Sequence, residues 1–166
     1  MMSTDKKYFK MPKRIFYLII IFSLILTACS EKKEPLAEDV SIFPDGRKID
    51  NDNFTGIAWL TMLVESDSLN AMYAGNVRFE PGTRTNWHSH PAGQLLIVID
   101  GEGYYQEKGH AKRILRKGDA VKCPPDTPHW HGASHNSDFS HIAISSSENG
   151  PTEWLEPVSE GEYFSK

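Results

Sequence analysis

The sequence has 166 residues, of which 39% are hydrophobic, enough for one domain with its own core and some short additional segments. Its formal net charge is −4, but the N-terminus is basic, and residues 29–166 carry 13 basic against 21 acidic side chains. An acidic folded part lacks the positive surface that a phosphate backbone requires, which excludes nucleic acid as a partner.

The N-terminal segment has the pattern of an export signal. Basic residues precede an apolar run over residues 15–26, which is shorter than the roughly 20 residues of a membrane-spanning helix. Thr27, Ala28 and Cys29 follow, and this ending resembles the lipobox of bacterial lipoproteins. That resemblance implies cleavage of residues 1–28, lipidation of Cys29, and a membrane anchor in the cell envelope, at the periplasmic face or the outer membrane. An uncleaved anchor helix is the alternative.

After the cysteine, residues 29–53 are polar and contain prolines and scattered charges, which predicts a tether whose end packs on the domain. Residues 54–157 form the predicted domain, and residues 158–166 a C-terminal tail. Short apolar runs alternate there with turn residues, and no amphipathic helix is evident beyond one helical turn at 152–156. We expect strands at 57–64, 71–79, 85–88, 95–100, 103–106, 113–115, 120–123, 129–133 and 139–145. This pattern predicts an all-β sandwich or barrel.

The predicted strand at 95–100 begins with five apolar residues in succession, so it is apolar on both faces. An exposed apolar sheet face is costly, which predicts that something covers the outer side. A second subunit is the expected cover, and the protein is therefore predicted to be a homodimer.

All seven histidines lie between residues 88 and 141. His88 and His90 are two positions apart, as are His129 and His131, and side chains at i and i+2 of a strand share a face. Two such pairs on separate strands predict a metal site, because imidazoles at this spacing make neighbouring ligands and a facing strand supplies a third. The tryptophan beside each pair should pack on the opposite face. Surface or hydrogen-bonded core histidines are the alternative.

Around these histidines the sequence resembles the two motifs of the cupin family. The first motif is matched by Gly82, His88, His90, Gln94 and Gly101, and the second by Gly118, Pro124 and His129. Two departures are Asp126 in place of a usual glycine and Ala133 in place of a usual asparagine. The resemblance implies a double-stranded β-helix, or jelly-roll, barrel. It also implies one divalent transition metal inside the barrel, bound by His88, His90, Gln94 and His129.

Gln94 stands where most cupins have a glutamate. A neutral amide oxygen leaves the ion its full charge, which makes it a stronger Lewis acid and stabilises higher oxidation states less. This favours polarising a hydroxyl, a carbonyl or water over activating oxygen. Four protein ligands leave two positions of an octahedral ion open, as catalysis requires. The donor set suits manganese, iron, cobalt, nickel or zinc.

Three stretches, 81–91, 129–133 and 140–144, are similar to small bacterial cupins related to the manganese-dependent (R)-hydroxynitrile, or mandelonitrile, lyases. Those cupins also have a glutamine ligand, and the resemblance favours manganese here. It implies a reaction pocket that contains Thr85, His131 and His141, with Val77 and Phe79 on its apolar wall. Orientation of a ligand is the alternative role for the two histidines.

The implied reaction is cyanohydrin cleavage, in which the metal binds the hydroxyl oxygen of a small-molecule substrate, a histidine takes its proton, and cyanide leaves. We therefore predict a metal-dependent lyase or isomerase that acts on a small hydroxy or carbonyl compound. A metal-dependent dioxygenase is one alternative. A non-catalytic envelope protein that binds a metal or a small ligand is the other.

Overall fold

The computed structural model describes residues 41–165. The predicted signal peptide, Cys29 and the first part of the predicted tether lie outside the described residues. Within residues 41–165 no helix is long and apolar enough to cross a membrane. The elements are β1 (Arg47–Lys48), β2 (Phe54–Thr55), β3 (Ala58–Val64), β4 (Met72–Phe79), β5 (Arg84–Thr85), β6 (His88–Ser89), β7 (Gln94–Glu107), β8 (Arg113–Arg116), β9 (Ala120–Cys123), β10 (His129–Ala133), β11 (Phe139–Ser146), β12 (Glu153–Trp154) and α2 (Glu160–Phe164).

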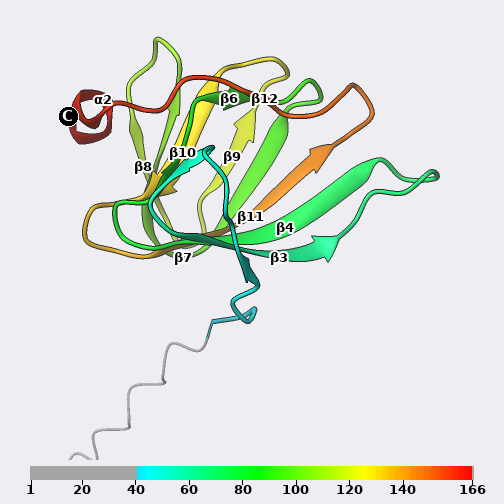
Figure 1. Ribbon diagram of the computed structural model, residues 1–166, viewed down its shortest axis with the longest axis horizontal. Coiled ribbons are helices and arrows are strands. Elements are labelled where there is room, and N and C mark those ends of the chain that lie inside the picture. The colour runs from blue at the N-terminus through cyan, green and yellow to red at the C-terminus, as the bar shows by residue number, and fades with distance from the viewer. Residues whose placement is uncertain (1–40, 166) are drawn as a thin grey trace, which may run out of the picture. The chain divides into compact units, whose positions relative to one another are not determined.

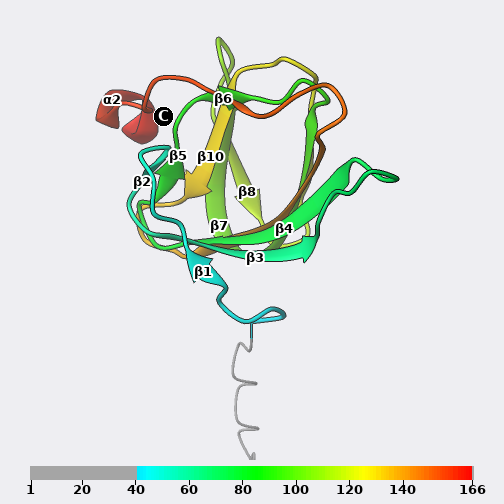
Figure 2. The same ribbon diagram turned by 45° about the vertical axis from the view of Figure 1, so that its right-hand side comes forward.

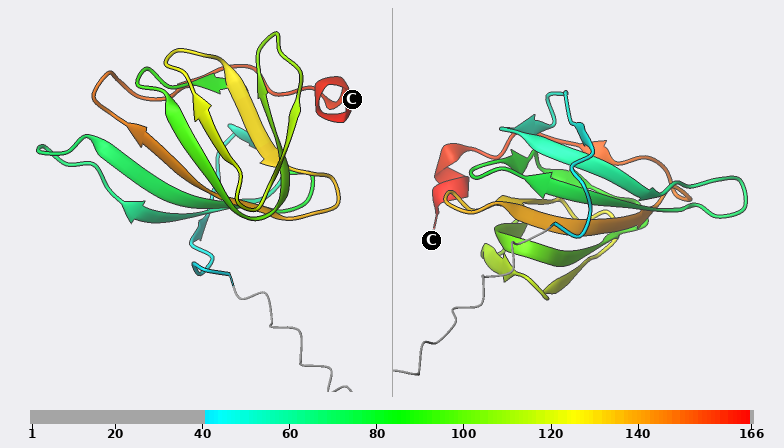
Figure 3. Two further views of the ribbon diagram at one scale, coloured as in Figure 1. Left: turned by 180° about the vertical axis from the view of Figure 1, so that it is seen from behind. Right: turned by 90° about the horizontal axis from the view of Figure 1, so that it is seen from below.

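The strands form two antiparallel layers of one curled sheet, which is the jelly-roll barrel predicted from the sequence (Figures 1 and 2). In one layer the order is β1-β3-β4-β11-β7, with β9 on the other edge of β7. In the other layer β10 pairs with β7, β5 and β6, and the short strands β2 and β12 extend it. Figure 3 shows the layers from behind and from below, with the β3–β4 hairpin projecting beyond the barrel.

β7 joins the two layers, and it corrects the prediction of two strands at 95–100 and 103–106. Its first half pairs with β11 and β9, and its second half pairs with β10 and β8. Gly101, at the junction, has a φ of 72°, a conformation that glycine adopts without steric cost. The glycines that suggested a turn therefore mark a bend by which a single strand passes from one layer to the other.

Two other local predictions were wrong. The predicted strand at 85–88 is divided into β5 and β6, which both pair with β10. The predicted helical turn at 152–156 contains β12, which pairs with β6 in register Trp154↔His88. Backbone bonds from Leu155 N–H to the carbonyl of Trp87, and from Trp87 N–H to that of Glu156, hold this segment extended.

The core lies in two places. Between the layers, buried residues from seven strands pack together: Ala58, Phe79, Leu96, Val98, Tyr105, Leu115, Val121, Cys123, Ala133 and Phe139. A second cluster, on the other face of β6 and β10, contains Trp87 and Trp130, as the alternation of the two strands predicts. Val158 and Tyr163 complete this second cluster, so the C-terminal segment packs on the barrel.

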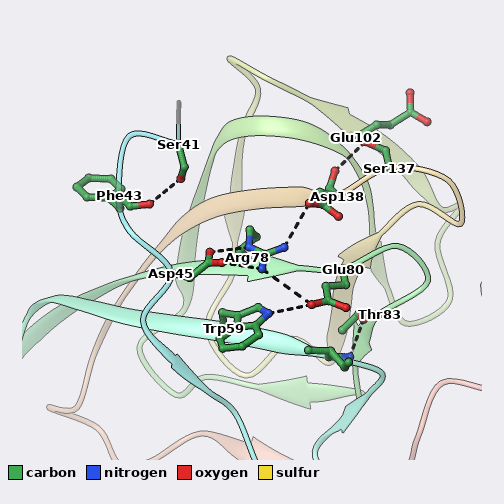
Figure 4. A network of polar contacts seen from close by, with 11 residues as sticks. Ser41, Phe43, Asp45, Trp59, Arg78, Glu80, Thr83, Glu102, Ser137 and Asp138 are labelled. Atoms are coloured by element: carbon green, nitrogen blue, oxygen red, sulfur yellow. Dashed lines mark hydrogen bonds and ion pairs between the residues drawn. The ribbon is translucent and has the colours of Figure 1, made fainter. Parts of the chain in front are cut away.

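The N-terminal arm, residues 41–46, packs on the outer side of β3 and β4 (Figure 4). Asp45 accepts a hydrogen bond of 2.7 Å from Arg78 Nε, and the carbonyl of Pro44 accepts one of 2.9 Å from Thr61 Oγ1. The same guanidinium lies 3.2 Å from Asp138. β1 then pairs with β3, and Ile49 packs against the inner core. The last part of the predicted tether thus belongs to the folded unit.

Candidate metal centre

The four predicted ligands come from three neighbouring segments: β6 with the residue after it, β10, and the start of β7. His88 on β6 is directly opposite His129 on β10, and their ring centroids are 4.2 Å apart. His90, one residue after β6, has its ring 5.2 Å from that of His88 and 5.6 Å from that of His129. Gln94 begins β7, and its Oε1 is 3.1 Å from His129 Nε2. The structure therefore brings His88, His90, Gln94 and His129 together, and all four are buried.

Each of these three histidines has its Nδ1 beside another group of the protein. His88 Nδ1 is 2.9 Å from the carbonyl of Asn86, and His129 Nδ1 is 2.9 Å from the carbonyl of Thr127. His90 Nδ1 is 3.1 Å from Thr152 Oγ1. A carbonyl only accepts, so Nδ1 carries the proton in His88 and His129, and Nε2 has a free lone pair. This is how metal-binding histidines are oriented.

Two further observations indicate that these side chains are suited to binding a divalent metal ion. His90 Nε2 is buried and has no hydrogen-bond partner among the described residues, although an orphaned buried nitrogen is costly. Burial lowers the pKa of His88 well below its usual value and that of His90 to about 4, and it also lowers the pKa of His129. All three rings are therefore neutral at neutral pH, which is the state that binds a metal.

Among the described residues, the set of three histidines that satisfies the distances for a metal is a different one. His88, His129 and His131 offer ligand atoms within 4.8 Å of one another. His131 differs from the other two because its side chain makes no hydrogen bond within residues 41–165, and its buried Nδ1 has no partner. Its ring lies edge-on to that of His141, at 4.8 Å. The orientation of Nδ1 therefore favours His90 over His131 as the third ligand.

A cavity of about 200 Å³ lies between the layers, and His88, His90 and His131 are among the residues that line it. Thr85, His131, Val77 and Phe79, which the family resemblance assigned to a reaction pocket, line it, together with the predicted ligands His88, His90 and Gln94. Its remaining walls are mostly apolar, and none of the described residues that line it is Asp, Glu, Lys or Arg. The cavity therefore suits a compact, uncharged molecule with a polar group at the histidine end.

His141 is placed differently from the other residues of the predicted pocket. It is completely buried and does not line the cavity. Its ring is stacked on that of Phe79, at 5.5 Å, and lies behind His131. Neither of its ring nitrogens has a hydrogen-bond partner among the described residues, and burial lowers its pKa to about 3. His141 therefore does not contact a molecule in the cavity directly, and it would influence one only through His131.

Sequence reasoning missed three residues around the site. Trp154 on β12 has its ring 4.9 Å from that of His88, and Thr152 contacts His90. Cys123 Sγ lies 3.0 Å from His129 Nδ1, and burial raises the pKa of this thiol to about 11, so it stays protonated. The spacing of residues in the sequence does not indicate these contacts, because each joins two segments that only the folded structure brings together.

Comparison with known proteins agrees with this geometry. Residues 75–145 match the model of the cupin domain. The chain is 38% identical over 113 residues to an (R)-mandelonitrile lyase from Granulicella tundricola, covering 68% of this chain and 86% of that protein.

Among solved structures, a cupin-like protein from Thermotoga maritima is 50% identical, with a TM-score of 0.72 over 74% of this chain and 94% of that chain. A cupin 2 conserved barrel domain protein from Rhodopseudomonas palustris shares the fold at 15% identity, with a TM-score of 0.56 over 66% of this chain and 74% of that one.

Proposed function

Because this chain belongs to the cupin family, we propose that it is a metal-dependent lyase that cleaves a small, uncharged hydroxy compound, with a cyanohydrin as its model substrate. One observation carries the proposal: His88, His90 and Gln94 line a mostly apolar cavity, and His129 lies beside them with its Nδ1, like that of His88, next to a backbone carbonyl. The relative from Granulicella tundricola, named as an (R)-mandelonitrile lyase, supports the same chemistry.

His88, His90, Gln94 and His129 would hold the ion, with manganese favoured among the divalent transition metals. A bound ion of this kind would supply Lewis acidity toward a substrate oxygen. The amide of Gln94 adds no negative charge, so the ion keeps its full charge for that role. The apolar wall around Val77 and Phe79 would exclude water and hold the body of the substrate.

The proton transfer falls to His131. Its unpartnered Nδ1 is buried, and burial holds its pKa well below its usual value, so the ring is neutral and can accept a proton. In cyanohydrin cleavage the hydroxyl proton moves to His131 as the bond from carbon to cyanide breaks, which yields an aldehyde and cyanide. The same proton then passes to cyanide and leaves as hydrogen cyanide. Thr85 Oγ1 accepts a bond of 3.2 Å from the His131 backbone N–H and so positions this strand.

We further propose that the mature protein is attached to the cell envelope by a lipid at Cys29. The apolar run that ends at Thr27-Ala28-Cys29 supports this, because it is too short to span a bilayer and ends in the pattern of a lipobox. The reaction would then take place outside the cytoplasm.

The test is cyanide release from mandelonitrile by protein loaded with Mn²⁺. Wild type should release cyanide faster than the metal-free protein, and His131→Asn should reduce kcat by about 100-fold or more while the metal content is unchanged. His135→Asn, at an exposed loop position, is the matched control and should behave as wild type. A loaded wild type no faster than the metal-free protein would contradict the proposal, as would full activity of His131→Asn.

A further inference from the structure

A second pocket, the outer pocket, adjoins the cavity that the predicted ligands line, which we call the inner cavity. The outer pocket has a volume of about 310 Å³, and four apolar residues line both: Ile49, Phe54, Leu60 and Trp154. The rings of Phe54 and Trp154 are in contact, with their centroids 5.7 Å apart. A ligand that extends from one pocket into the other would therefore pass along an apolar, partly aromatic wall.

The rest of the outer pocket is polar and exposed. Its other four lining residues are Arg47, Lys48, Asp50 and Asn51. Two cationic side chains against one anionic side chain leave a net charge of +1, whereas residues 29–166 as a whole carry 13 basic against 21 acidic side chains. None of the three charged side chains forms an ion pair with another residue in the range 41–165, so all three are available to a ligand. A local positive charge on an acidic protein attracts anions.

Strand pairing determines the direction in which Arg47 points. Arg47 is opposite Leu60 on β3, and Leu60 is opposite Val77 on β4. Residues that are directly opposite on paired strands have their side chains on the same face of the sheet. Leu60 and Val77 both line the inner cavity. Arg47 therefore lies on the inner face of the sheet, at its edge strand, where its guanidinium can reach a molecule that extends out of the inner cavity.

We propose that the outer pocket is a second binding site, which takes the carboxylate of an aryl hydroxy compound while the uncharged hydroxy end of that compound occupies the inner cavity. This inference rests on the proposed function for the reaction, and it extends the substrates from small uncharged compounds to longer ones with an acidic far end. The carboxylate takes no part in the cleavage. The bond from carbon to cyanide breaks in the same way, and the products are hydrogen cyanide and an aldehyde that keeps the carboxylate.

The charges and the shared wall favour an aromatic ligand with a single negative charge. A guanidinium can donate two parallel hydrogen bonds to the two oxygens of one carboxylate, and the net charge of the pocket balances one such group. Asp50 in the same pocket would repel a ligand with more negative charge. The rings of Phe54 and Trp154 offer a surface on which the aromatic body of the ligand can pack.

The direct test is calorimetric binding of two matched ligands to the full chain, loaded with Mn²⁺ in a non-ionic detergent. The acid is para-(hydroxymethyl)benzoate, which combines the hydroxyl, the ring and the carboxylate. The amide is para-(hydroxymethyl)benzamide, which lacks only the charge. Wild type should bind the acid about fivefold more tightly than the amide, because a partly exposed ion pair adds a modest attraction. High salt should reduce this preference, because it screens an exposed ion pair.

Variants of the charged lining residues assign the preference to the outer pocket. Arg47→Gln should remove the preference for the acid, and Asp50→Asn should increase it, a gain that misfolding cannot produce. Arg113→Gln, at another exposed position but on β8 and outside both pockets, is the matched control and should keep the preference of wild type. Equal affinity of wild type for the two ligands would overturn the inference, as would a preference for the acid that survives in Arg47→Gln.

Cyanide release separates this inference from the proposed function. Mandelonitrile has no acidic group, so its cleavage tests the proposed function alone, whereas the cyanohydrin of para-formylbenzoate tests both. The kcat/KM for this acidic cyanohydrin, relative to that for mandelonitrile, should fall about fivefold from wild type to Arg47→Gln. A wild type that cleaves mandelonitrile but binds the acid and the amide equally would contradict the outer pocket alone. A wild type that prefers the acid through Arg47 but cleaves neither cyanohydrin would contradict the proposed function and support the outer pocket as a binding site.

Discussion

At the scale of single residues, the site depends on which ring nitrogen each histidine leaves free. Backbone carbonyls of Asn86 and Thr127 fix two of the rings through Nδ1, and Thr152 contacts the third. These three contacts would orient the three imidazoles as ligands of the proposed ion. Gln94, the proposed fourth ligand, would set the charge at the ion, and its Oε1 lies 3.1 Å from His129 Nε2.

Replacing Gln94 with glutamate should tighten metal binding and slow the reaction. The added negative charge should lower the dissociation constant of Mn²⁺ by about tenfold or more, since 1.4 kcal/mol of additional attraction corresponds to a factor of ten. The same charge makes the ion a weaker Lewis acid, so kcat for cyanohydrin cleavage should fall. Competition with a chelator measures the affinity, and Gln94→Leu, which has no ligand atom, is the control. Equal affinity in wild type and both variants would show that Gln94 is not a ligand.

Spacing predicted that His88 and His90 share a face and that His129 and His131 do, because the period of a strand places i and i+2 on one side. The choice of His90 and His129 as ligands came from the cupin resemblance, and the register His88↔His129 brings the two pairs together. The orienting contacts could not be predicted. Thr152 and Cys123 reach His90 and His129 through a strand and a turn whose positions depend on pairing between distant segments. The hydrophobic pattern predicts which face of the sheet a side chain occupies, but it does not predict which residue that side chain contacts across the barrel.

At the scale of elements, the sequence predicted the bounds of a strand best where turn residues lie at both of its ends. The predicted strands at 120–123 and 129–133 coincide with β9 and β10. The bend in β7 was misread, because a glycine with positive φ serves a turn and a bulged strand equally well. Residues 158–166 were predicted to be a C-terminal tail, yet Val158 and Tyr163 are almost completely buried.

The contact of α2 with the barrel should be worth a measurable part of the stability. Tyr163 OH donates to the buried carbonyl of Ala133 at 2.8 Å, and the guanidinium of Arg84 lies 4.5 Å from the centre of the tyrosine ring. Tyr163→Phe keeps the ring and leaves that carbonyl without its partner, so the free energy of unfolding should fall by about 1–2 kcal/mol. Urea denaturation measures it. Phe164→Ala, at a position 61% exposed, should change it by less than about 0.5 kcal/mol. Equal losses would contradict the assigned contact.

At the scale of the whole molecule, burying several histidines in one place couples folding to pH. Burial lowers the pKa of His88, His90, His129, His131 and His141 in the folded chain. In the unfolded chain their pKa is close to the ordinary value of about 6.5. Below that pH the unfolded chain binds protons that the folded chain does not, so the stability that is fully present above it is lost as the pH falls.

The metal-free protein should therefore lose stability steeply between pH 6.5 and about 4, where the pKa of folded His90 lies. Each such histidine contributes up to about 1.4 kcal/mol per pH unit in this range. Urea denaturation at pH 7.5, 6.5 and 5.5 gives the slope. His131→Asn removes one buried imidazole, so the free energy of unfolding should change less steeply with pH. His135→Asn removes an exposed imidazole and should leave this slope unchanged. A free energy of unfolding that stays level from pH 7.5 to 5.5 would contradict the neutral, buried state of these rings.

The central claim is that His90, and not His131, completes the metal site with His88 and His129. The most direct measurement is the metal content of the purified protein by mass spectrometry, after incubation with manganese, iron, cobalt, nickel and zinc. We predict about one divalent ion per chain in wild type and in His131→Ala, and its loss in His90→Ala. A wild type without metal, or an ion that is retained in His90→Ala and lost in His131→Ala, would contradict the account.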